Sequence, residues 1–166
     1  NLYLRPADFV NCRWDDVPAG SLAALLSVTS CEKMITVGEL ASIDAAVALC
    51  VLNGVDWLML HAEQPQFANA AAAIAGEAYG YAACQAAGIN FVFEPHLAWF
   101  YKDITPPINN ITEMAFNCDV LSIPSHAIQA TVLWPQWLHT LWDLVWAERP
   151  GLEIWAQTSV QPPSDT

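Results

Sequence analysis

Two pairs of residues that can do acid–base chemistry lie at the ends of apolar segments of this sequence. His61 and Glu63 follow one apolar run, and Glu94 and His96 follow another. Residues two apart on a β-strand point to the same face, so His61 and Glu63 would share a face, and Glu94 and His96 would do so if Pro95 leaves the strand geometry intact. Neighbouring strands lie about 4.8 Å apart, so the two pairs would be within reach of each other if their strands are neighbours.

Two carboxylates placed in this way favour hydrolysis of a glycosidic bond. Glu94 would be the general acid or base and Glu63 the nucleophile or second carboxylate, because both stereochemical courses need two carboxyl groups about 5 to 9.5 Å apart. His61, His96 and His126 would assist, and this mechanism requires no cofactor. The opposing interpretation is that both glutamates are solvated residues beside loops, which is ordinary for charged residues at strand ends.

Other residues near the predicted strand ends could bind a carbohydrate or another small molecule. Trp99, Phe100 and Tyr101 follow Glu94 closely and would form an aromatic platform for a sugar ring. The polar candidates for substrate binding are Glu39, Gln157 and Arg5. In the opposing interpretation the aromatic residues pack under a loop, Gln157 completes the sheet end and Arg5 pairs with an acidic residue.

A divalent metal site is the second hypothesis. His61, Glu63, Glu94 and His96 would be the ligands, and His126 could join them. Mixed imidazole and carboxylate ligation suits zinc, iron or manganese, and a bound ion could polarise a substrate or activate water. The sequence has no HExxH motif, and a single histidine at a strand end is more often a hydrogen-bonded neutral residue.

A non-catalytic binding or assembly module is the alternative from a different class. The last predicted helix, residues 131–148, contains Trp134, Trp137, Trp142 and Trp146, and its apolar positions exceed what one sheet can cover. This excess favours packing against another copy of the chain or against segments that the sequence lacks.

The elements that must position these residues alternate between strand and helix. The strand predictions cover residues 1–5, 33–39, 55–60, 89–93, 119–123 and 152–156. The helix predictions cover residues 22–28, 42–52, 65–87, 108–116 and 131–148. A strand–helix repeat of about thirty residues is typical of right-handed parallel crossovers, so the fold class is α/β.

Two α/β architectures fit about six such units. A small or incomplete (β/α) barrel of the TIM type is favoured over an open doubly wound sheet, because polar residues end nearly every strand and both GxGxxG and GxxxxGK[ST] are absent. A complete eight-unit barrel typically needs about 250 residues. The sequence predicts one α/β domain over residues 1–166, and the form of both ends suggests a piece of a longer polypeptide.

Composition limits the partners. With 17 acidic and 5 basic residues the formal charge is −12, which argues against binding nucleic acid or an anionic membrane surface. The apolar segments are too short to span a membrane. The Asn110-Ile111-Thr112 sequon favours a secreted or extracellular protein, with a soluble cytoplasmic protein as the alternative. Glu-Pro-His after a strand and the late Pro-Gly-Leu-Glu-Ile-Trp-Ala-Gln-Thr-Ser segment resemble the later half of secreted (β/α)-barrel proteins.

Overall fold

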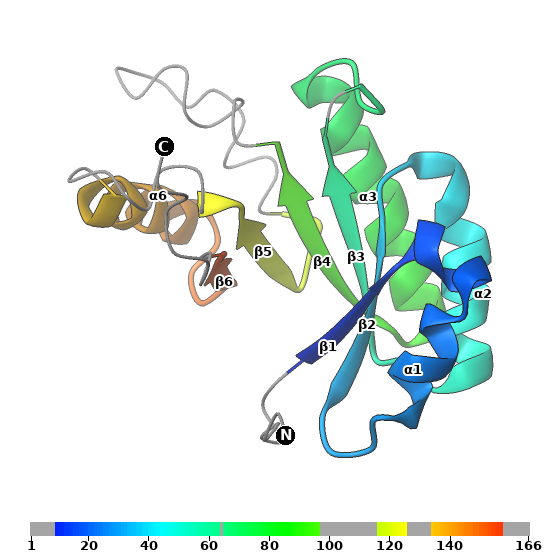
Figure 1. The fold of residues 1–166 in the computed structure, drawn as a ribbon. Helices are drawn as coiled ribbons and strands as arrows, with labels where there is room; N and C mark the ends of the chain where they lie inside the picture. Colours follow the sequence, from blue (N-terminus) through cyan, green and yellow to red (C-terminus); the bar gives the residue numbers. More distant parts are fainter. Residues whose placement is uncertain (1–8, 64, 97–115, 126–133, 158–166) are drawn as a thin grey trace, which may run out of the picture.

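The computed structural model describes residues 9–63, 65–96, 116–125 and 134–157, and these form one parallel six-stranded sheet with four α-helices (Figure 1). The strands are β1 (Phe9–Arg13), β2 (Glu32–Val37), β3 (Trp57–Ala62), β4 (Asn90–Pro95), β5 (Val120–Ile123) and β6 (Glu153–Ala156). The helices are α1 (Ser21–Ser27), α2 (Ile43–Asn53), α3 (Ala70–Ala87) and α6 (Trp134–Glu148), with 3₁₀ turns at Trp14–Ala19 and Leu40–Ser42. The α/β class predicted from the sequence is confirmed.

The six strands are ordered along the sheet as they are in the chain, and every neighbouring pair is parallel. A doubly wound sheet reverses its strand order at a switch point, and this sheet has no reversal. In the described part of the chain β1 and β6 are its two edges, so the sheet is not closed into a barrel.

One face of the sheet is covered by helices and holds the main core. Strand residues on this face pack in a single cluster with residues from all four helices, among them Leu25, Ile43, Ala73 and Leu141. In Figure 1, α1, α2 and α3 lie together on one side of the strands, and α6 lies beside β5 and β6. Right-handed crossovers between consecutive strands place their helices on the same face, which is what this cluster reflects.

The opposite face is concave and carries a second, smaller apolar cluster. Trp57 of β3 and Trp155 of β6 approach to 5.7 Å between ring centroids, above a small cluster of Met34, Met59, Val92 and Val120. β3 and β6 are three strand spacings apart, about 14 Å in a flat sheet, so their contact indicates that the sheet curves toward this face.

On the concave face, apolar side chains give way to polar ones toward the C-terminal strand ends. In five strands, an apolar residue is followed two positions later by a polar one on the same face. These pairs are Met34 and Thr36, Met59 and His61, Val92 and Glu94, Val120 and Ser122, and Trp155 and Gln157. The concave face therefore has an apolar layer in the middle of the strands and a polar layer at their C-terminal ends.

The first described strand is one that the sequence did not predict. The prediction of residues 1–5 falls outside the described residues, and β1 is Phe9–Arg13. Its sequence FVNCR alternates between Val10 and Cys12, which belong to the helix-covered core, and Asn11 and Arg13 on the other face. Most of the predicted helix at residues 108–116 also lies outside the described residues.

The start of α3 corrects a second boundary. The sequence predicted a helix from Pro65, but the helix begins at Ala70, because the Asn69 side chain accepts a hydrogen bond from the Ala72 amide at 2.9 Å. Gly88 ends it in the left-handed conformation with φ of 72°. The later start lengthens the connection between β3 and α3 by residues 65–69, and this connection includes Gln66 beside the site described below.

Two cysteines are small residues of the core. Cys50 and Cys84 are fully buried, and burial raises the pKa of each thiol to about 12. Within the described ranges, no helix combines the length and apolarity needed to cross a membrane.

Close packing of α3 on the sheet depends on Gly80. A Cβ atom at this position would lie 2.7 Å from two ring atoms of Phe91, which is fully buried. We expect Gly80→Ala to lower the free energy of unfolding by about 1–3 kcal/mol through overpacking, although alanine favours helix by about 1 kcal/mol. Urea unfolding measures this loss. The double variant Gly80→Ala, Phe91→Leu should recover part of it, and a Gly80→Ala variant more stable than the parent would contradict the packing argument.

Candidate functional site

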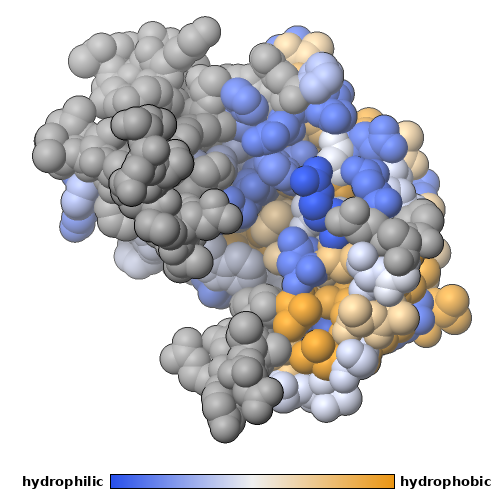
Figure 2. Space-filling view, viewed as in Figure 1, coloured by the Kyte–Doolittle hydropathy of each residue, from blue (hydrophilic) through white to orange (hydrophobic). Residues whose placement is uncertain are grey.

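Polar groups gather where the strands end. In Figure 2, hydrophilic residues cluster in the upper middle of the visible face, where β3 and β4 end in Figure 1, and hydrophobic residues lie below them near α1. A hollow of about 240 Å³ opens at this end of the sheet. Its lining residues are Arg13, Asp15, Gly38, Glu39, His61, Glu63 and Gln66. In parallel α/β folds, this end of the sheet is where binding and catalytic sites form.

The two predicted residue pairs are brought together by β3 and β4. The two strands are neighbours, and His61 is the register partner of Glu94. The His61 Nε2 atom lies 3.4 Å from Glu94 Oε1. The expected proximity of the two strand ends is therefore confirmed.

Glu63 reaches the same imidazole by way of a tight turn. Its backbone amide donates to the carbonyl of His61 at 3.2 Å, so the chain folds back directly after β3. Its Oε1 atom then lies 2.9 Å from His61 Nε2. A strand continued past Ala62 would instead have carried Glu63 further along the sheet.

The two carboxylates are consequently close. Both distances end on the same Nε2 atom, so the two Oε1 atoms can be no further apart than the sum of 2.9 and 3.4 Å, about 6.3 Å. This bound between the nearest oxygens is compatible with the separation of about 5 to 5.5 Å between the carboxyl groups of retaining glycosidases and with the lower part of the range of about 6.5 to 9.5 Å in inverting ones.

Glu94 and Glu63 differ sharply in their exposure. The residue Glu94 is 1 % exposed, whereas the side chains of His61 and Glu63 are 27 % and 47 % exposed. The Oε2 atom of Glu94 accepts hydrogen bonds from Ser122 Oγ at 2.6 Å and from the Gln157 side-chain amide. Glu94 is thus a buried carboxyl held from β5 and β6, and Glu63 faces the hollow.

The other predicted site residues have different positions. Glu39 lines the hollow and accepts a hydrogen bond from Ser42 Oγ at 2.9 Å. His96 is half-buried directly after β4 and is not among the residues lining the hollow. Gln157 supports Glu94, as described above. The remaining candidates Arg5, Trp99, Tyr101 and His126 lie outside the described residues.

Several residues at the site were missed by sequence reasoning. Ser122 was hidden within the strand VLSI, although its position two residues after Val120 on the inner face is the signal that could have revealed it. Arg13 was missed because no strand was predicted over residues 9–13, and it stands at the end of β1 beside the hollow. Thr36 donates to Asn11 Oδ1 at 2.9 Å and extends the polar layer to β1.

The metal hypothesis stays a prediction. Within the described ranges, no group of three or more His, Cys, Asp or Glu side chains is arranged to hold a metal ion. The carboxylates of Glu63 and Glu94 both approach the Nε2 atom of His61. His126, the further ligand that the hypothesis allows, lies outside the described residues.

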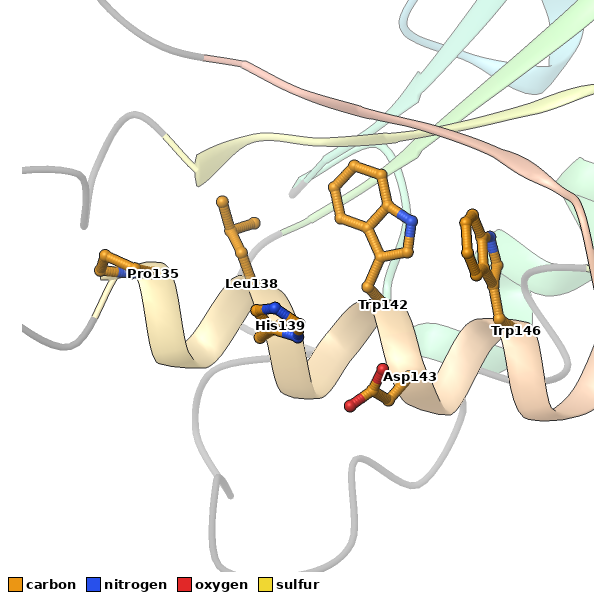
Figure 3. A pocket seen from close by; sticks show the side chains of 6 residues that line it. All are labelled: Pro135, Leu138, His139, Trp142, Asp143 and Trp146. Atoms are coloured by element: carbon orange, nitrogen blue, oxygen red, sulfur yellow. The ribbon is translucent and has the colours of Figure 1, made fainter.

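A second concavity lies on α6, away from the hollow. It has a volume of about 460 Å³ and is lined by Pro135, Leu138, His139, Trp142, Asp143 and Trp146. Figure 3 shows Leu138, Trp142 and Trp146 standing in a row along one side of the helix, with His139 and Asp143 beside them. We refer to these six residues as the α6 groove.

The Glu63–His61–Glu94 cluster is the candidate active site, since it combines buried and exposed carboxylates, an imidazole and an open polar hollow. No protein-family model matches the chain and no curated protein is significantly similar to it, so its function is inferred below from the geometry of this site.

Proposed function

We propose that the protein hydrolyses a glycosidic bond at the Glu63–His61–Glu94 cluster. The observation that carries the proposal is the meeting of two carboxylates at one imidazole nitrogen, at 2.9 and 3.4 Å. Their nearest oxygens lie within about 6.3 Å of each other, which is compatible with the retaining course, in which one carboxylate attacks and the other supplies the proton.

The difference in exposure between the two carboxylates supports separate roles for them. Glu63 faces the hollow, so its carboxylate attacks the anomeric carbon while the bond to the leaving oxygen breaks. The proton for the leaving oxygen comes from Glu94 through His61, because His61 separates the buried carboxyl from the hollow. Water then releases the sugar from Glu63, and its proton returns to Glu94 by the same route.

The partners of Glu94 suit a group that gains and loses a proton. A serine hydroxyl and a glutamine amide can each donate or accept a hydrogen bond. Ser122 and Gln157 can therefore stay bonded to Glu94 in its ionised and its protonated form. A buried carboxyl without such partners would leave an unsatisfied polar group in one of the two states, at a cost of about 1–3 kcal/mol.

The hollow is suited to a small polar ligand. Its volume of about 240 Å³ lies below the roughly 300–1,000 Å³ of pockets for drug-sized molecules, and most of its lining side chains are charged or polar. These features support a single sugar unit as the ligand bound beside Glu63. A carbohydrate substrate in turn supports the predicted secreted location.

The fold supports the same proposal. We infer that the curved, sequentially ordered sheet is an incomplete (β/α) barrel of the TIM type, in which the concave face corresponds to the barrel interior. In such barrels the loops after the strands carry the catalytic groups, and Glu63 and Glu94 lie at the corresponding end.

A panel of aryl glycosides and soluble polysaccharides tests the proposal. The purified protein should release nitrophenol or reducing ends from at least one of them. The Glu148→Gln variant, altered on the exposed surface of α6, controls for preparation and should be equally active. A complete lack of hydrolysis across α- and β-linked neutral, amino and acidic sugars would contradict the proposal.

The α6 groove favours a second candidate, an assembly module that pairs two copies of the chain. Trp146 remains 48 % exposed within an apolar row on one helix face. His139 and Asp143 flank this row one turn apart, so antiparallel pairing of two α6 helices would set each His139 against the partner's Asp143. That pairing would bury the apolar row of the groove and give its two polar side chains partners.

A charge placed in the groove tests the second candidate. If α6 pairs with itself, His139→Glu should reduce the native mass from twice 18.2 kDa to 18.2 kDa in sedimentation, because the new carboxylate would face the partner's Asp143. Ala147→Glu adds a charge to the same helix outside the groove and should leave the dimer intact. A monomeric parent protein would contradict the assembly role.

A further inference from the structure

Gln157 is fixed by three hydrogen bonds directly after β6. Its backbone amide donates to the carbonyl of Ile123 at 2.8 Å, and its carbonyl accepts from the Ser125 hydroxyl at 2.8 Å. Its side-chain amide donates to Glu94 Oε2. The end of β5 thus holds both backbone groups of Gln157, which directs its side chain across to the end of β4.

The side chain of Gln157 contacts a residue two strands away. β6 pairs with β5, and β5 pairs with β4, so Gln157 and Glu94 are not on neighbouring strands. The curvature of the sheet brings the two together on the concave face. Ser122 on the intervening strand occupies the same Oε2 atom, which leaves Oε1 as the atom nearest to His61.

We propose that Gln157, held in place by Ser125, is a positioning residue that keeps Oε1 of Glu94 turned toward His61. A carboxylate with two hydrogen bonds on one oxygen has a fixed orientation about its terminal torsion, which is otherwise soft. Gln157 does not line the hollow, so it acts through Glu94 and leaves substrate binding to other residues. The catalytic consequence of this role rests on the function proposed above.

Gln157→Met tests the proposal, since methionine keeps the length of the side chain and removes its amide. In a crystal structure of the variant, the distance between Glu94 Oε1 and His61 Nε2 should increase beyond about 4 Å, the limit for an ion pair. For the aryl glycoside found in the panel, kcat should fall by about 10- to 100-fold, as expected for a lost hydrogen bond to a charged group, with KM changed less than about twofold. Gln136→Met, on the exposed surface of α6, is the matched control and should change neither quantity.

Ser125→Ala supplies a second variant if Gln157→Met folds poorly. Loss of the hydroxyl releases the carbonyl of Gln157, so the same rotation of Glu94 is expected. An unchanged Glu94 carboxylate in the variant structures overturns the positioning role, whatever the activity. A rotated carboxylate in a protein that hydrolyses no glycoside would keep the positioning role and refute the proposed function.

Discussion

Glu63→Ala is expected to lower the hydrolysis of a 2,4-dinitrophenyl glycoside by about 10⁴-fold or more, and sodium azide is expected to restore much of the loss. Glu63 faces the hollow with 47 % of its side chain exposed, so its removal leaves a space that a small anion can enter. Azide would attack the anomeric carbon in place of the carboxylate, and dinitrophenolate would leave without needing a proton. The glycosyl azide product, identified by mass spectrometry, should have the configuration opposite to that of the substrate.

Glu94→Gln should give the complementary result. The amide cannot supply a proton, so hydrolysis of a phenyl glycoside, which needs one for its leaving group, should fall by about 10²- to 10⁴-fold. With the dinitrophenyl glycoside, the bond to the leaving group should break in the first step at nearly the parental rate. Equal losses on both substrates for both variants, without rescue by azide, would show that the two glutamates do not divide the roles of nucleophile and acid.

The convergence of the site could be predicted because it depends on two regular features. Parallel neighbouring strands end at the same edge, and residues two apart share a face, so the order of β3 and β4 alone brings His61 opposite Glu94. The close approach of Glu63 depends on a turn that the strand pattern does not encode. Its backbone hydrogen bond to His61 arises after β3 has ended.

The supporting residues around Glu94 were harder to predict. Gln157 was expected to contact substrate, since a polar side chain after a strand gives no sign of its partner. Its bond to Glu94 crosses the intervening strand β5 and depends on the order of the strands in the sheet. Ser122 could have been found from the apolar-to-polar step along each strand, because it follows Val120 by two residues as His61 follows Met59.

α3 contains the residue least predictable from sequence. Glu77 lies in an alanine-rich segment where a glutamate would be expected to face water, yet it is fully buried. Cys118 and Arg149 lie nearby, and Arg149 donates to the carbonyls of Phe116 and Cys118. The burial of Glu77 therefore depends on segments about 40 and 70 residues further along the chain.

The burial of Glu77 changes its protonation. Desolvation raises its pKa from 4.5 to about 9, and the backbone of Asn117, the thiol of Cys118 and the charge of Arg149 lower it only in part. Neither carboxyl oxygen has a hydrogen bond of normal geometry among the described residues. Glu77 is accordingly protonated in the folded protein at neutral pH, whereas it is ionised in the unfolded chain.

Glu77→Gln is therefore expected to stabilise the protein at neutral pH and to leave it little changed in acid. Between pH 4.5 and about 9 the unfolded chain releases this proton and the folded protein retains it, so the parent loses stability as the pH rises. The slope is about 1.4 kcal/mol per pH unit, or about 3 kcal/mol between pH 5 and pH 7, and it flattens above pH 9. Glutamine keeps the shape and cannot ionise, so the variant lacks this contribution.

Urea unfolding at pH 5, 7 and 9 gives the difference in the free energy of unfolding between the two proteins. The titration of all other groups cancels in this difference. Glu148→Gln, exposed on α6, should follow the parent at every pH. Parallel curves for Glu77→Gln and the parent would mean that Glu77 is ionised in the folded state and that Arg149 compensates its charge.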